Sequence, residues 1–194
     1  MIRRRQFLQL PLVASAAASI MPPLVASDDH GSFVQSAVEA ARSPMMVKAG
    51  ADRDGAPIQA VEATFHVKVS GKDTEGRCVV FDTLRPNKVG PRLHLHIDCD
   101  EWFFVREGEF KFQVGTETMR LMPGDSLLVP KNMQHAFVKT SEGVARLIVM
   151  HQPAGTMEEF FRSAAGRKDM TPEARTAVAE KHGMRFRGPA LTPD

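Results

Sequence analysis

The segment HLHIDCDE, residues 94–101, carries side chains whose types and spacing suit a metal ion. His94 and His96 are two residues apart, and alternate side chains of a β-strand lie on the same face, so both imidazoles point the same way. Glu101 follows five residues later, where a short bend can return its carboxylate toward the imidazoles. Imidazole and carboxylate groups are ligands of divalent transition metals. The spacing therefore predicts a metal site, which needs further ligands from another part of the chain.

The region from about residue 58 to residue 152 has the pattern of many short β-strands. In ATFHVKV, Phe65 and Val67 alternate with His66 and Lys68. We therefore expect the side chains of Phe65 and Val67 to be buried and His66 to be exposed. Turn signals separate further strand-like runs, which are RCVVFDTL, RLHLHI, EWFFVR, EFKFQV, ETMRLM, SLLVP, QHAFVKT and ARLIVMH. Short strands at regular spacing are typical of a β-sandwich or β-barrel.

A third histidine, His135, lies in PGDSLLVPKNMQHAF, again between apolar neighbours. This segment and the first one together resemble the two sequence motifs of the cupin superfamily. The first motif, a glycine, HxH, a glutamate and a second glycine, is matched in order by Gly90, His94, His96, Glu101 and Gly108, with a short spacer after Gly90. The second motif is matched by Gly124, Pro130 and His135. The resemblance covers roughly residues 58–152 and is specific, because two motifs agree in order and spacing.

Two positions depart from the second motif. Asn132 stands where the family has glycine, and Asn is the next most tolerant residue for a left-handed turn. Lys139 stands where the motif ends in asparagine, so any role of that asparagine is lost.

The resemblance implies an all-β fold, a cupin double-stranded β-helix (jelly-roll barrel) over residues 58–152, followed by a C-terminal helical tail over residues 153–194. It also implies that one metal is held by four residues, His94, His96, Glu101 and His135. Such a donor set suits Fe, Mn, Ni, Co or Zn, and the sequence does not distinguish among them. The alternative is polar packing in a metal-free barrel, which is costly because burying four such groups without a partner is unfavourable.

The tail segments PAGTMEEFFRSAA and KHGMRFRGP resemble those of single-domain, quercetinase-like cupins. This implies a metal-dependent oxygenase that acts on a phenolic or enolic small molecule, with Glu101 as the catalytic base. Two alternatives stay open: another cupin enzyme, such as an isomerase or decarboxylase, and a non-catalytic small-molecule-binding protein. The chain has no Tyr, which argues against the sugar-epimerase cupins that use a tyrosine acid. No DNA-binding helix pair is recognisable.

The N-terminus has the features of an export signal. Arg4 and Arg5 precede Gln-Phe-Leu and an Ala-, Leu- and Val-rich stretch, which resembles a twin-arginine signal peptide with cleavage near Ser27. The alternatives are an uncleaved anchor and a basic start that arises by chance. The resemblance implies contact with the twin-arginine export machinery and a periplasmic location. We expect residues 28–57 to form an N-terminal extension with a short helix in SFVQSAVEAAR.

Removal of residues 1–27 changes the charge of the chain. The full sequence has 25 basic and 23 acidic residues; loss of three Arg leaves 22 and 23, a net charge of −1. Nothing in this balance indicates nucleic-acid binding. We expect a small-molecule substrate and regard a homodimer as compatible with the sequence.

Several further residues carry open expectations. Cys78 and Cys99 can pair in an oxidising compartment, although the apolar run around Cys78 favours a free thiol. His151 ends a strand-like run, where it could approach the barrel rim, and Arg92 is a solvated charge or binds an anionic substrate. Four alternating phenylalanines pack in the core or line a pocket above the metal: Phe103, Phe110, Phe112 and Phe137.

After Pro153, TMEEFFRSAA and PEARTAVAEKHG predict two helices. The second has Thr171 as N-cap and Pro172 at its first position.

Overall fold

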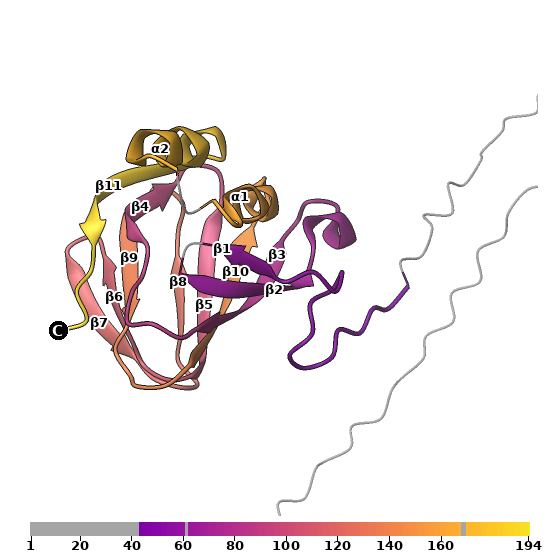
Figure 1. The fold of residues 1–194 in the computed structure, drawn as a ribbon, viewed down its shortest axis with the longest axis horizontal. Coiled ribbons are helices and arrows are strands. Elements are labelled where there is room, and N and C mark those ends of the chain that lie inside the picture. Colours follow the sequence, from indigo (N-terminus) through magenta and orange to yellow (C-terminus); the bar gives the residue numbers. More distant parts are fainter. Residues whose placement is uncertain (1–42, 61, 168–169) are drawn as a thin grey trace, which may run out of the picture. The chain divides into compact units, whose positions relative to one another are not determined.

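The fold consists mainly of two antiparallel β-sheets (Figure 1). The computed structural model describes residues 43–60, 62–167 and 170–194. Residues 44–194 form one compact unit. The expected signal peptide and the expected helix in SFVQSAVEAAR lie outside the described residues. In the described part of the chain, no helix is long and apolar enough to span a membrane.

Each sheet combines strands that are distant in sequence. The first sheet has the order β1 (Ile58–Ala60), β2 (Ala63–Val69), β3 (Val79–Arg85), β10 (Ala145–Gln152), β5 (Asp100–Glu107) and β8 (Ser126–Val129). The second has the order β11 (Met184–Ala190), β4 (Arg92–His96), β9 (His135–Lys139), β6 (Phe110–Val114) and β7 (Glu117–Leu121). A short 3-10 helix spans Gly71–Thr74. Pairs such as β3 with β10 and β4 with β9 are the crossovers of a jelly roll, so the expected all-β architecture is confirmed.

The apolar faces of the strands form two clusters. Three of the four alternating phenylalanines, Phe103, Phe110 and Phe112, are fully buried in one cluster with Leu147 and other barrel residues. In this cluster the rings of Phe103 and Phe112 lie 5.0 Å apart, centroid to centroid. The second cluster joins strands β2 and β3 to the helices, through Phe65, Phe81, Met157, Phe160 and Phe161.

The two predicted C-terminal helices are present, as α1 (Met157–Ala164) and α2 (Pro172–Lys181). The Thr171 hydroxyl accepts a hydrogen bond from the Ala174 amide at 3.2 Å, so the predicted N-cap is confirmed. The segment expected as a helical tail also contains strand β11, which pairs with β4. The local sequence MRFRGPA contains Gly and Pro, which disfavour a strand, and the pairing partner supplies what the local pattern lacks.

The expectation that His66 is exposed was wrong. Its exposed fraction is 7%, although it lies on the face of β2 that alternates with charged residues. His66 is opposite Asp82 on β3, whose carboxylate binds Arg106 at 3.1 Å and Arg146 at 2.5 Å. We attribute the burial to this cluster of charged side chains on the outer face of the sheet, since long arginine side chains cover their neighbours.

The two cysteines do not form a disulfide. Both are free thiols; Cys99 is buried and Cys78 is half-buried. Burial and the nearby carboxylates of Glu101 and Asp98 raise the pKa of the Cys99 thiol to about 12. Cys99 is therefore protonated at neutral pH and packs as a small apolar residue.

Gly90 marks a close approach between two backbone segments, and its replacement by alanine is expected to be severely destabilising. A Cβ atom at this position would lie 1.7 Å from the Phe137 carbonyl oxygen. Since the clash is with backbone, we expect Gly90→Ala to lower the free energy of unfolding by about 3 kcal/mol or more in chemical denaturation. The control is Gly55→Ala, where φ is 69° but no atom lies within 4 Å, and the expected cost is about 1–2 kcal/mol. Equal losses in the two variants would contradict the close-approach explanation.

Candidate metal centre

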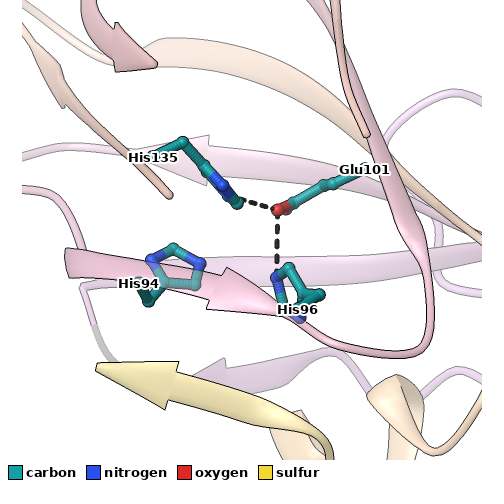
Figure 2. A group of neighbouring side chains, drawn as sticks. All are labelled: His94, His96, Glu101 and His135. Atoms are coloured by element: carbon teal, nitrogen blue, oxygen red, sulfur yellow. Dashed lines mark hydrogen bonds and ion pairs between the residues drawn. The ribbon is translucent and has the colours of Figure 1, made fainter. Parts of the chain in front are cut away.

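Three strands bring the four expected ligands together. His94 and His96 come from β4, Glu101 from the start of β5, and His135 from β9. His94 and His135 are directly opposite each other in the β4–β9 pair, which fixes the relative position of the two sequence motifs. All four side chains are buried, and their ligand atoms lie within 4.8 Å of one another (Figure 2).

The turns of both motifs support these positions. Asn132 has a φ of 65°, so the expectation that this residue takes a left-handed conformation is confirmed. Its amide donates a hydrogen bond at 2.7 Å to the carbonyl of His96. The turn before His135 is thereby tied to the end of the strand that carries His94 and His96.

The Glu101 carboxylate contacts two of the three histidines of the group. Its Oε2 atom lies 2.8 Å from His135 Nε2 and 3.1 Å from His96 Nε2, as the dashed lines in Figure 2 show. The Nδ1 atoms of His94 and His135 instead lie 2.7 Å and 3.0 Å from the backbone carbonyls of Arg92 and Met133, to which an N–H donates. A carbonyl that holds one ring nitrogen orients the other toward the centre, as is usual for metal-binding histidines.

Burial and mutual charge set the protonation of the group. Burial, reinforced by the neighbouring His135 and His96, holds the pKa of His94 well below its usual value. Burial also lowers the pKa of His96, despite the opposing effect of Glu101. Burial alone would raise the pKa of Glu101, but the charge of His151 and hydrogen bonds from the surrounding imidazoles hold it well below its usual range.

His135 is the exception among the histidines. Burial lowers its pKa, yet its hydrogen bond to Glu101 and the charge of that carboxylate raise the pKa overall. At neutral pH the group therefore offers a carboxylate anion, two neutral imidazoles and one imidazole that must release any bound proton to act as a ligand. The donor set, the converging atoms and the carbonyl-held rings fit a divalent transition metal.

His151 is a fifth polar residue of the centre that the sequence analysis did not assign to it. It is 0% exposed, and its Nε2 atom lies 3.3 Å from Glu101 Oε1, on the opposite carboxylate oxygen from His96 and His135. It lies directly opposite Glu101 in the β10–β5 pair. The sequence did contain a pattern that predicts this position, because alternation in ARLIVMH places His151 on the same inward face as Leu147 and Val149.

A cavity of about 1030 Å³ opens from the centre. His94, His96 and Glu101 lie in its wall. The wall also contains apolar side chains from the barrel, from α1 and from β11, namely Phe65, Phe137, Val149, Phe160, Phe161, Met184 and Phe186. Of the four phenylalanines expected in the core or a pocket, Phe137 lines this cavity. Aromatic walls around a few polar groups are typical of small-molecule sites.

Arg92 lies in the cavity wall and is exposed. Its guanidinium stands over the Phe186 ring, 4.5 Å from the centroid, and its Nε atom lies 3.4 Å from the Gly188 carbonyl oxygen. Strand β11 thus holds the Arg92 side chain in place through a cation–π contact.

Comparison with known proteins identifies the fold. Residues 80–151 match the Cupin domain family. Similar solved structures include KdgF from Halomonas sp. (TM-score 0.46, 18% identity, 55% of this chain and 94% of that chain). An RmlC-like cupin from Shewanella frigidimarina is also similar (0.44, 20%, 51% and 84%), as is ectoine synthase from P. lautus (0.46, 17%, 70% and 83%). A search of curated proteins found no significant match. The family match and the two-sheet topology confirm a cupin β-barrel.

Proposed function

We propose that this cupin barrel is a metal-dependent oxygenase that acts on a phenolic or enolic small molecule. The observation that carries the proposal is the buried group of His94, His96, Glu101 and His135, three members of which (His94, His96 and Glu101) lie in the wall of an aromatic-lined cavity of about 1030 Å³. Four protein ligands on a six-coordinate ion leave two positions for other molecules, whereas structural zinc sites close at four ligands. The resemblance of the C-terminal segments to quercetinase-like cupins also supports this choice.

The side chains of the centre suit proton removal from a substrate hydroxyl. A bound divalent ion would act as a Lewis acid that stabilises a substrate anion. Glu101 is ionised at neutral pH, because His151 and the other imidazoles lower its pKa, so its carboxylate is in the unprotonated form that the proposed base role requires. His151 contacts Oε1 and can hold the carboxylate in place while Oε2 faces His96 and His135. The phenyl walls bind an apolar ring and exclude water.

The proposal is tested by elemental analysis of natively produced protein, coupled to an oxygen-uptake screen on flavonols, catechols and diketones. The expected result is a transition metal at about one ion per chain, together with substrate-dependent oxygen consumption. Turnover without oxygen uptake would assign the protein to another class of cupin enzyme. Binding without turnover would make it a non-catalytic binding protein.

We further propose that the protein is exported by the twin-arginine route to the periplasm. That route carries folded proteins, as the resemblance implies, so the metal can be acquired in the cytoplasm before export. The support for this step is the arrangement of Arg4, Arg5, Phe7 and Leu8 before an apolar stretch.

Charge-conserving replacement of the arginine pair tests the export route. Arg4→Lys combined with Arg5→Lys is expected to keep the protein in the cytoplasm, because the paired guanidinium groups rather than the net charge are the recognised feature. The measurement is cell fractionation followed by immunoblotting. Arg3→Lys is the matched control, since it makes the same change one residue before the pair. Normal periplasmic accumulation of the double variant would remove the twin-arginine assignment.

A further inference from the structure

Arg85, at the end of β3, places a buried cation in the wall of the same cavity. Its exposed fraction is 2%. Its Nε atom donates to the Thr83 hydroxyl at 3.1 Å, and Nη1 donates to Glu62 Oε1 at 2.6 Å. The guanidinium carbon lies 4.6 Å from the Phe137 ring centroid and 5.6 Å from that of Phe65. Two aromatic faces and two hydrogen bonds therefore fix the orientation of the guanidinium.

The hydrogen bonding of this ion pair is incomplete. Within the described parts of the chain, Arg85 makes its hydrogen bonds through Nε and Nη1, and Oε2 of Glu62 is buried without a hydrogen-bond partner. Burial lowers the pKa of Arg85 more than Glu62 raises it, and burial raises the pKa of Glu62. Buried charges are usually fully hydrogen-bonded, because an unmade bond costs the desolvation of the group. Arg85 therefore retains donor capacity for an additional anion.

The charges around the cavity also favour an anion. Its described lining contains four arginines, Arg85, Arg92, Arg167 and Arg175, and the carboxylates of Glu62 and Glu101. Even without Arg175, the basic side chains of this lining outnumber the carboxylates, which favours an anionic ligand, and a bound divalent ion would add positive charge. An excess of one sign of charge around a cleft raises the local concentration of ligands of the opposite sign.

We propose that Arg85 recognises a carboxylate on the substrate, so that the cavity takes a flat aromatic or enolic acid. The hydroxyl end of this acid lies at the centre formed by the three histidines and Glu101, and its carboxylate end lies at Arg85. The assignment of the hydroxyl end rests on the proposed function, whereas the assignment of the carboxylate end rests on Arg85 alone. Phe137 and Phe65, which flank the guanidinium, provide faces for the ring of the substrate.

Two catechols that differ in one substituent, a carboxylate or a neutral hydroxymethyl group, test this assignment. The probes are 3,4-dihydroxybenzoate and 3,4-dihydroxybenzyl alcohol, titrated calorimetrically into the metal-loaded mature protein. Hydrogen bonds to charged groups contribute about 1.5–3 kcal/mol, so the acid is expected to bind about 10–100-fold more tightly than the alcohol. Equal affinities, or no binding of either probe, would overturn the inference.

The two members of the ion pair predict opposite effects. Arg85→Gln is expected to remove the preference for the acid, whereas Glu62→Gln is expected to increase it, because the substrate carboxylate no longer competes with Glu62 for Nη1. An ion pair with a purely structural role would not give effects of opposite sign. The double variant Arg85→Gln with Glu62→Gln removes both charges and leaves no buried charge unpaired, so it separates lost recognition from lost stability. It is expected to fold and to bind both probes equally.

Arg92→Gln tests the competing position for the carboxylate, at the exposed arginine over Phe186. It is expected to change the acid-to-alcohol preference by less than about threefold, as is usual for an exposed charge. Loss of the preference in Arg92→Gln but not in Arg85→Gln would overturn the assignment to Arg85.

The same measurements separate the carboxylate site from the proposed oxygenase activity. Preferential binding of the acid without oxygen uptake on any phenolic acid would refute the oxygenase but would still support the carboxylate site. Oxygen uptake on neutral phenols alone would support the oxygenase and refute the carboxylate site.

Discussion

Metal content is expected to fall sharply when either His96 or His135 is replaced by alanine, and the double variant is expected to bind essentially no metal. Each change removes one of the four proposed ligands from a buried group. Disturbing the groups that support a ligand costs about 10–100-fold in affinity, so loss of a ligand itself is expected to cost more than about 100-fold.

This pair is the most informative one because the two histidines come from different motifs. His96 lies on β4 and His135 on β9, and the Nε2 atoms of both rings lie within hydrogen-bond distance of Glu101 Oε2. Loss of metal in both single variants would show that the two motifs contribute to one site. Full occupancy in the double variant would show that the proposed site is wrong.

The measurement is metal per chain by elemental analysis, after dialysis against a weak chelator. His182→Ala is a matched control, because His182 is a histidine outside the group, at the end of α2, with a hydrogen bond to the Thr156 hydroxyl. It should retain wild-type metal content. Thermal unfolding of all the variants separates loss of ligands from loss of the fold.

Glu101→Gln is expected to lower turnover per bound metal far more than it lowers metal binding. As a ligand, Glu101 contributes negative charge: with it, three neutral imidazoles and one anion leave a divalent centre at a net charge of about +1. Glutamine keeps the size and one coordinating oxygen but removes both the charge and the basicity. Metal binding should weaken by about 10–100-fold, similar to other disturbances of a metal site.

The base role predicts a larger effect on chemistry. General-base catalysis typically contributes about 10²–10⁴-fold, so activity per bound metal should fall within that range. The measurement is the rate of substrate-dependent oxygen uptake divided by metal content, for wild type and Glu101→Gln. Glu107→Gln is the control on the same strand, since Glu107 is exposed and lies outside the centre. Equal activity per metal in wild type and Glu101→Gln would restrict Glu101 to the role of a ligand.

Short-range patterns in the sequence were sufficient for much of the fold. Alternating or apolar runs between turn signals identified every strand from β2 to β10, because a strand that packs on a core buries one face or both. The N-cap at Thr171 and the left-handed turn at Asn132 were likewise predictable, because both depend on the conformation of a few neighbouring residues. The fixed spacing of the two histidine motifs predicted which four side chains the structure brings together.

Pairings between distant strands decided the rest. Strand β11 exists because β4 offers it a partner, and His151 reaches Glu101 because β10 lies beside β5. The environment of Lys139 was also set by distant segments: its side chain is buried, and its ammonium donates hydrogen bonds to the carbonyls of Pro86 and Gly143.

The contents of the cavity depend on tertiary structure most of all. Alternation marks Phe103, Phe110, Phe112 and Phe137 alike as inward-facing, and all four belong to one core cluster, yet of the four Phe137 also lines the cavity. Arg85 appears in the sequence as an ordinary charge at a strand end, and only the fold sets it between two phenyl rings and beside Glu62. The direction of a side chain is a local property of a strand, whereas the chemical group that it meets depends on segments far away in the chain.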